Sequence, residues 1–139
     1  MIQLFISFAL LFINQNPPDA KQIIKDKLQN QTECWNKGNM ECFMEAYWES
    51  DSLQFIGGSG ITYGWDNTLQ RYKAGYPTER ERGVLTFTIK SIDLINLETC
   101  FVVGMFHLTR EIGDDEGHFS LLWKKKYGEW VIVADHSSN

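Results

Sequence analysis

The sequence is poor in proline, histidine and cysteine, with three residues of each among 139. It also lacks a basic excess, since 13 Lys and Arg residues stand against 18 Asp and Glu. A domain with this acidic balance cannot neutralise a phosphate backbone, so nucleic acid is not expected as a partner. The 22% charged and 43% hydrophobic residues exclude a disordered, collagen-like or coiled-coil chain. The length predicts one domain.

Motifs that mark common enzyme classes are also missing. The sequence has no CxxC zinc spacing, phosphate-binding loop, dinucleotide fingerprint or Ser-His-Asp signature, so we expect no metal and no cofactor. Aromatic residues, in contrast, are abundant at 14%, with 5 Trp, 5 Tyr and 9 Phe. Because so small a domain cannot spread these rings over its surface, most of them should line a core, a pocket or an interface.

The three cysteines are Cys34, Cys42 and Cys100, and an odd number leaves at least one thiol without an internal partner. Cys34 and Cys42 lie near the ends of two adjacent predicted helices, which would allow a bridge. We expect buried free thiols instead, because free cysteine behaves as a small apolar residue.

The N-terminus carries an uncharged apolar run from Leu4 to Ile13. The run is too short to span a membrane but fits the apolar core of a secretory signal. We therefore expect residues 1–15 to be a signal peptide, which predicts a secreted or periplasmic protein that makes no membrane contact after signal removal. The alternative is an N-terminal helix or strand packed on the domain of a cytoplasmic protein.

The first half of the remaining chain predicts three helices and two short strands. Asp19 can cap a helix that ends at Gly38, and Asn39 can cap a second helix at once. Strands are expected at 53–56 and 61–63, followed by a third helix from about residue 65 that Pro77 ends. The charged stretch 78–83 is expected to be an exposed loop.

From Val84 the pattern changes to strands, at about 84–95, 99–110, 117–127 and 129–136. Their connections are too short for crossover helices, so the strands should be antiparallel neighbours. The segment 100–108 is apolar at both parities, which is typical of a central strand covered on both faces. These elements predict an α+β fold in which three helices close the concave side of a strongly bent, half-open cone of strands.

The sequence resembles the nuclear transport factor 2-like superfamily, and within it the SnoaL-like polyketide-cyclase and ketosteroid-isomerase-related branch. The resemblance covers about residues 19–138, and we place the domain at 16–139. It depends on 35–39 (WNKGN) with Phe43, Met44 and Tyr47, on Gly60 and Gly64 before Trp65, on 117–121 (GHFSL), and on the ending 128–137 (GEWVIVADHS). The resemblance implies a cone-shaped domain, a homodimer formed by sheet-on-sheet packing, and a pocket for a small, often apolar molecule.

Acid–base chemistry in such a pocket needs a carboxylate or imidazole that faces inward. Asp135 and His136 are adjacent on the last strand, so alternation sends only one of them inward. The family-like ending favours His136 over Asp135 at the pocket, but for the pair we prefer a structural role, in which hydrogen bonds to the backbone tie down the C-terminus. His107 is the third catalytic candidate, and as a lone histidine in an apolar strand it is more typical of a satisfied core residue.

The remaining pocket candidates are aromatic, apart from Arg110, for which we expect a surface salt bridge rather than a contact with a substrate carboxylate or with Asp135. The candidates that would line the pocket are Trp35, Tyr47, Phe55, Trp65, Tyr72, Tyr76, Arg110 and Trp123. The leading hypothesis is a domain that binds a small, largely apolar molecule. The alternatives are an isomerase, cyclase or dehydratase acting on a small hydrophobic carbonyl compound, and a non-catalytic homodimeric association module, because a fold of this kind does not decide function.

Overall fold

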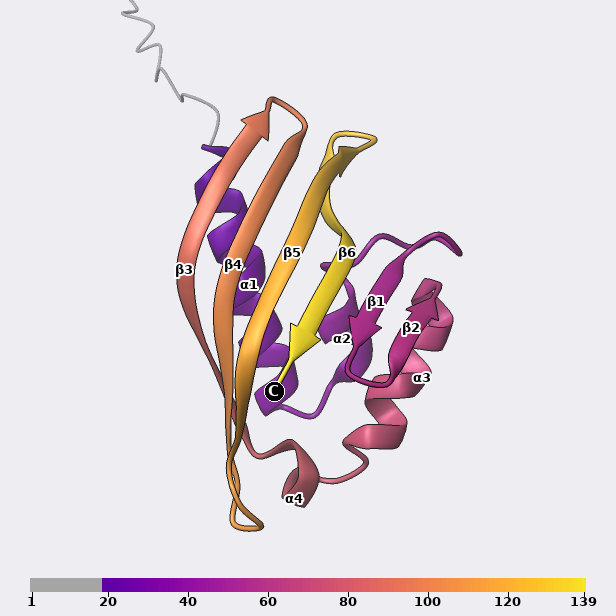
Figure 1. Ribbon diagram of the computed structural model, residues 1–139, viewed down its shortest axis with the longest axis vertical. Coiled ribbons are helices and arrows are strands. Elements are labelled where there is room, and N and C mark those ends of the chain that lie inside the picture. The colour runs from indigo at the N-terminus through magenta and orange to yellow at the C-terminus, as the bar shows by residue number, and fades with distance from the viewer. Residues whose placement is uncertain (1–18) are drawn as a thin grey trace, which may run out of the picture.

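The computed structural model describes residues 19–139, and the expected signal peptide lies outside these described residues. A six-stranded mixed sheet dominates the structure, in the order β2-β1-β6-β5-β4-β3 (Figure 1). The strands are β1 (Gln54–Gly57), β2 (Gly60–Tyr63), β3 (Val84–Asn96), β4 (Thr99–Thr109), β5 (Asp115–Lys126) and β6 (Glu129–Ser138). The sheet is curved and does not close, which confirms the predicted α+β half-open cone.

The helices cover one face of this sheet. They are α1 (Ala20–Asn36), α2 (Met40–Met44), α3 (Trp65–Gly75) and α4 (Glu79–Arg82). In Figure 1 α1 runs behind β3–β6, and α3 lies beside β1 and β2. Asp19 and Asn39 cap α1 and α2 as expected, and Gly38 between them has a φ of 73°, which glycine adopts without strain. None of the helices in residues 19–139 is long and apolar enough to cross a membrane.

The stretch 78–83 is not the loop that the sequence suggested. It forms the short helix α4, because the Thr78 side chain bonds to the N3 backbone while Glu81, at N3, bonds back to the Thr78 backbone N–H. This capping box was not recognised among the surrounding charges. Since no residue of α4 is buried, the predicted exposure of the stretch was nevertheless right.

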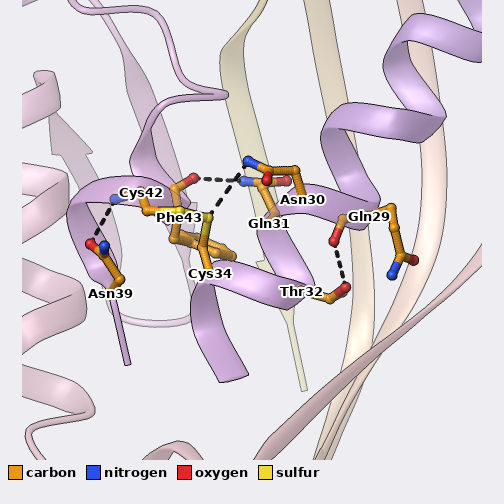
Figure 2. The surroundings of a disulfide bond; sticks show 8 residues. All are labelled: Gln29, Asn30, Gln31, Thr32, Cys34, Asn39, Cys42 and Phe43. Atoms are coloured by element: carbon orange, nitrogen blue, oxygen red, sulfur yellow. Dashed lines mark hydrogen bonds between the residues drawn. A yellow bond between two sulfur atoms is a disulfide. The ribbon is translucent and has the colours of Figure 1, made fainter. Parts of the chain in front are cut away.

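A second correction concerns Cys34 and Cys42, which form a disulfide rather than free thiols (Figure 2). Their Cα atoms lie 5.5 Å apart, because the turn at Gly38 and Asn39 folds the start of α2 back against the end of α1. Cys100 is free and buried, as predicted. The sequence could not decide the pairing because it does not give the angle between the two helices.

Strands β3 to β6 form the predicted antiparallel meander, and β1 joins β6 in parallel. Even-numbered residues of β4, such as Val102 and Leu108, are buried under the helices. The odd-numbered side chains face outward on the convex side, where Phe101 is 38% exposed. The expectation that both faces of this strand are covered is therefore wrong for the single chain.

Strand β6 contains a bulge that reverses its side-chain alternation. Leu122 pairs with Ala134 and the next residue, Trp123, pairs with Ile132, so Val133 has no partner across the strand pair. Before the bulge Ile132 points under the helices, and after it Asp135 does so. An odd and an even position thus share the concave face of one strand.

Candidate functional site

The concave face of the sheet and the helices enclose a cavity of about 100 Å³. Its wall is almost wholly aromatic and aliphatic. The lining residues are Gln31, Trp35, Phe43, Tyr47, Phe55, Tyr72, Tyr76, Leu85, Phe87, Phe106, Leu108, Phe119, Leu121, Asp135 and Ser137. The rings contact one another edge-on in many places; Trp35, for instance, meets Tyr76 at 4.8 Å and Phe43 at 5.3 Å between ring centres.

One carboxylate, Asp135, lies in this wall and is only 3% exposed. The Tyr47 hydroxyl donates to Asp135 Oδ2 at 2.6 Å, and the Ser137 hydroxyl donates to Oδ1 at 2.7 Å. Tyr72 Oη lies 3.1 Å from Tyr47 Oη. Because the Tyr47 proton is directed to the carboxylate, Tyr72 donates to Tyr47, and the chain of hydroxyls ends on Asp135.

Three separate elements bring these groups together. Tyr47 follows α2 and is held against β6, where the backbone N–H of Trp48 donates to Ile132 O at 2.9 Å. Tyr72 projects from α3, and the bulge turns Asp135 and Ser137 inward from β6. The cluster therefore depends on the register of β6 against its neighbours.

Burial controls the protonation of the cluster. It raises the pKa of Asp135 above the usual value, and the hydrogen bonds from Tyr47 and Ser137 offset this rise only in part. The pKa values of Tyr47 and Tyr72 lie well above that of a free phenol. Burial is the main cause, and the charge of Asp135 is the second. Both hydroxyls thus stay protonated, while Asp135 can exchange a proton nearer neutral pH than an exposed carboxylate.

The structure separates the aromatic candidates into two groups. Trp35, Tyr47, Phe55, Tyr72 and Tyr76 line the cavity. Trp65 and Trp123 do not, and their placement in the pocket was wrong. Trp65 is half-buried and its indole N–H donates to Met44 O at 3.0 Å. Trp123 is sealed in the core at 0% exposure, where its indole nitrogen has no hydrogen-bond partner among residues 19–139.

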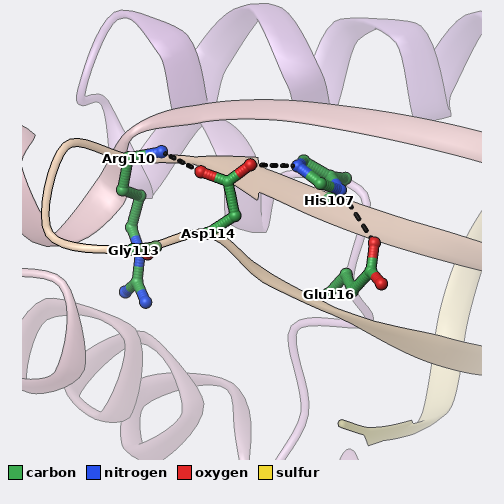
Figure 3. Close-up of polar contacts among 5 residues, drawn as sticks. All are labelled: His107, Arg110, Gly113, Asp114 and Glu116. Atoms are coloured by element: carbon green, nitrogen blue, oxygen red, sulfur yellow. Dashed lines mark hydrogen bonds and ion pairs between the residues drawn. The ribbon is translucent and has the colours of Figure 1, made fainter.

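The two histidine candidates are not in the cavity. His136 is exposed on the convex side, so the preference for His136 rather than Asp135 as the residue in the pocket was wrong. The bulge at Val133 is the physical reason, because it turns Asp135 to the face on which Ile132 lies. His107 is likewise not a core residue. It lies on the convex side near the turn between β4 and β5, where Nε2 is 2.9 Å from Asp114 and Nδ1 is 3.0 Å from Glu116 (Figure 3).

These two carboxylates raise the pKa of His107 through their hydrogen bonds. Arg110 follows β4 next to the same turn, but Figure 3 shows its side chain running past Gly113, away from His107. It lines a hollow outside the cavity and makes none of the surface salt bridges that we expected, judged over residues 19–139.

Two polar residues of the cavity were missed from the sequence. Ser137 could have been found from its spacing of two from Asp135, which places both side chains on one face of a strand. Gln31 stands at a core-facing position of α1, seven residues after Ile24, and is 2% exposed. Its side-chain amide donates to Phe43 O at 3.2 Å. In residues 19–139, His, Cys, Asp and Glu side chains form no group of three suited to a metal ion.

The comparisons with known proteins agree with this architecture. No family model and no curated protein matches the sequence. Among solved structures, an NTF-2 like protein of unknown function from Shewanella oneidensis MR-1 is 37% identical with a TM-score of 0.83, over 87% of this chain and 100% of that chain. The chain therefore belongs to the nuclear transport factor 2-like superfamily.

More distant structures share the fold alone. A ketosteroid isomerase-like protein from Erwinia carotovora atroseptica SCRI1043 is 15% identical, with a TM-score of 0.64 over 84% of this chain and 93% of that chain. An NTF2-like protein of unknown function from Pseudomonas putida KT2440 is 11% identical, with a TM-score of 0.69 over 86% of this chain and 85% of that chain. The superfamily assignment leaves the activity open, so function must be argued from the cavity.

Proposed function

We propose that this protein binds a small, largely apolar molecule in the cavity, with a polar group of that molecule at the Asp135 end. The observation that carries the proposal is one hydrogen-bonded carboxylate in a largely apolar, ring-lined wall. A few fixed polar groups in an apolar hollow are typical of small-molecule sites. The carboxylate and hydroxyl oxygens keep unused lone pairs that can accept from a ligand hydroxyl group, and the protonated carboxyl of Asp135 can donate to a ligand carbonyl group.

The cavity volume restricts the ligand. At about 100 Å³ the cavity is smaller than the engineered cavity of about 150 Å³ that takes up benzene. The buried body of the ligand is therefore expected to be no larger than a five- or six-atom ring or a short branched chain. A steroid-sized molecule would require the rings that line the wall to move apart.

Binding can be tested with cyclopentanone and cyclopentane, which share a shape but differ in the carbonyl group, using protein NMR shifts to measure dissociation constants. We expect both to bind, and the ketone to bind more tightly. Leu121→Phe fills the cavity and should abolish binding. The matched control is Leu122→Phe, because the adjacent side chain faces the convex side. Equal binding by the two variants, or none by the natural protein, would contradict the proposal.

A second candidate is an acid–base enzyme of the isomerase or lyase type without a cofactor, acting on a small hydrophobic carbonyl compound. The specific support is that Asp135 is buried, faces the cavity and has a pKa raised by burial, which makes its carboxylate a stronger base than an exposed one. The test is exchange of the α-protons of cyclopentanone in D2O, followed by NMR. Catalysed exchange that is lost in Asp135→Asn would support an enzyme. Binding of cyclopentanone without exchange would contradict the enzyme and leave the binding function as the conclusion.

We also propose that the chain is exported to an oxidising compartment. The apolar run at 4–13 and the Cys34–Cys42 disulfide support this, because disulfides persist mainly outside the reducing cytosol. The test compares the full chain with one that lacks residues 2–15, by cell fractionation and by mass spectrometry after thiol alkylation. Retention of both forms in the cytosol with Cys34 and Cys42 reduced would contradict the proposal.

The homodimer implied by the resemblance is proposed to use the convex face of the sheet. On this face β4 carries a row of partly exposed apolar side chains, Phe101, Val103 and Met105, and Leu122 of β5 lies beside the row. Sedimentation at micromolar concentration should give a dimer for the natural protein and a monomer for Val103→Glu. Arg80→Glu at an exposed position on α4, outside the sheet, is the control and should remain dimeric. A monomeric natural protein would exclude this interface.

A further inference from the structure

A second hollow, of about 410 Å³, adjoins the cavity and is much more polar. The two spaces share part of their lining: Phe55, Tyr72, Tyr76, Phe106 and Ser137 belong to both. The two spaces are therefore adjacent, with these side chains between them, and we call the second space the outer hollow. A ligand whose apolar body fills the cavity would place its other end there.

Two arginines, Arg71 from α3 and Arg110 at the end of β4, line the outer hollow. Both side chains are half-buried. In the part of the chain that the structure describes, neither guanidinium lies within 4.0 Å of a carboxylate oxygen. A partly desolvated cation without a counter-ion is costly unless something supplies the missing charge. Guanidinium groups match carboxylates in shape and in hydrogen-bond geometry.

Uncharged groups hold Arg71 in position. Its Nη1 donates to Thr62 Oγ1 at 3.1 Å, and its guanidinium carbon lies 4.7 Å from the ring centre of Phe55. A Cβ atom at Gly57 would overlap Nη2, so the glycine leaves the space that this group occupies. These contacts orient the guanidinium but leave most of its N–H donors free among the described residues.

Arg110 is held in the same manner by backbone. Its Nε donates to Gly113 O at 2.8 Å and Nη1 donates to Glu81 O at 3.2 Å. A Cβ atom at Gly83 would overlap Thr109 O and lie 2.5 Å from Cγ of Arg110, so the glycine allows the end of β4, with Arg110, to lie close to the residue after α4. The outer hollow also contains Asp115 and the last residue of the chain, Asn139, and Asp115 Oδ1 accepts from Asn139 Nδ2 at 3.1 Å. Asp115 does not neutralise either arginine directly, since among the described residues no carboxylate oxygen lies within 4.0 Å of either guanidinium.

We propose that the outer hollow binds a carboxylate, so that the ligand is a small organic acid whose apolar body occupies the cavity. This inference rests on the proposed binding function and adds the chemical class of the ligand. Arg71 and Arg110 hold the carboxylate at the outer end, where it is kept away from the buried Asp135. Tyr76 lies in the lining of both spaces, between the two ends of the ligand.

The test compares 3-methylbutanoate with 3-methylbutanamide, which have nearly the same size and shape but differ in charge. In the natural protein at low salt we expect the acid to bind about tenfold more tightly than the amide, as charge-assisted hydrogen bonds predict. Added salt should reduce this advantage, because the outer hollow is partly open to solvent. Dissociation constants from NMR titration provide the measurement.

Arg71→Gln and Arg110→Gln should each reduce the preference for the acid severalfold while the amide affinity stays the same. The control is Arg80→Gln, which removes the same charge from an exposed position on α4 that lines neither space. Circular dichroism confirms that each variant is folded, and the two arginine variants are independent of each other.

The possible outcomes separate the two proposals. Equal affinity for acid and amide in the natural protein overturns the carboxylate site but leaves the cavity proposal intact. The same holds if Arg80→Gln lowers the preference as much as the other two variants, since the cause is then the overall charge. Binding of cyclopentanone without binding of either probe also overturns the carboxylate site. If cyclopentanone fails to bind as well, the binding function itself is wrong.

Discussion

The hydroxyl of Tyr47 donates a 2.6 Å hydrogen bond to Asp135 Oδ2, which joins residues 88 positions apart in the sequence. The contact links the segment after α2 to the last strand, and Tyr72 extends it to α3 at 3.1 Å. The position of the carboxylate in the cavity therefore depends on three elements packing at once. Changes in any of them are expected to alter both the stability of the fold and the properties of Asp135.

Tyr47→Phe removes the donor but keeps the ring. We expect the free energy of unfolding at neutral pH to fall by about 1.5–3 kcal/mol, because a buried carboxylate loses a hydrogen bond. Tyr72→Phe is the matched control and should have a smaller effect, since the Tyr47–Asp135 bond remains. Urea unfolding monitored by circular dichroism gives both values. A larger loss for Tyr72→Phe would contradict this account of the hydroxyl chain.

Asp135→Asn tests the raised pKa of the carboxyl group. A raised pKa means that the folded protein binds this proton more tightly than the unfolded chain, so ionisation lowers the stability of the fold. The stability of the natural protein relative to the variant should therefore decrease as pH rises from below the usual aspartate pKa through the raised value. Urea unfolding at a series of pH values measures the difference.

The control for that series is Asp114→Asn, for which the sign is opposite. The backbone N–H of Arg110, and then His107, lower the pKa of the Asp114 carboxyl by hydrogen bonding. The stabilisation by its ionised form is lost as pH falls through the lowered pKa, so this variant should differ from the natural protein least in strong acid. The same pH trend in both variants would argue against the placement of the two carboxyls.

His107 provides a separate pH dependence at the β4–β5 turn. Asp114 and Glu116 raise its pKa, so the stabilisation is fully present below the usual histidine pKa and is lost as pH rises through the raised value. His107→Gln should therefore be less stable than the natural protein at acidic pH, and the difference should vanish in alkali. Thermal unfolding at a series of pH values measures this difference in stability. The control is His118→Gln, on the same face of the sheet. Equal effects of the two variants would contradict the pairing of His107 with Asp114 and Glu116.

Reduction of the Cys34–Cys42 disulfide should destabilise the fold by about 2.5 kcal/mol. The estimate follows from the chain entropy of a loop whose ends are eight positions apart. Urea unfolding with and without reductant measures the effect, and a Cys34→Ser, Cys42→Ser double variant should show no response to reductant. Cys100→Ala, which changes the buried free thiol, should retain the full response. A reductant effect that persists in the double variant would contradict the assigned pairing.

Gly117→Ala should be strongly unfavourable, because a Cβ atom there would overlap Ser138 O and lie 2.7 Å from its carbonyl carbon. We expect a loss of about 1–3 kcal/mol and a displacement of the end of β6, which carries Ser137. Gly58→Ala is the control, since nothing lies within 4 Å of the added atom. Urea unfolding compares the two variants, and similar stabilities would show that β6 is placed incorrectly.

Much of the fold could be predicted from local patterns. The caps at Asp19 and Asn39 and the turn at Gly38 depend on residues close in sequence, and the structure confirms them. The meander of strands followed from alternation and short connections. The capping box of Thr78 and Glu81 was missed for a different reason, since its signal was present in the sequence and was outweighed by the surrounding charges.

The candidate site was predicted less well. Five aromatic candidates line the cavity because each stands on the apolar face of a helix or strand or just after the end of a helix: Trp35, Tyr47, Phe55, Tyr72 and Tyr76. The choice between Asp135 and His136 failed, since it followed the family-like ending, and alternation alone did not tell which of the two faces the cavity. One extra residue, Val133, reverses that alternation, and a bulge depends on the register of two strands rather than on the residue itself.

The sequence by itself determined the order of helices and strands and the α+β class, because hydrophobic period, caps and turns act over a few residues. It also placed most rings on faces that must be buried. Only the tertiary structure decided that Cys34 meets Cys42, that Asp135 rather than His136 enters the cavity, and that Arg71 and Arg110 line one hollow. Each of these depends on distances between segments far apart in the chain, which helix packing and strand register establish only when the whole domain folds.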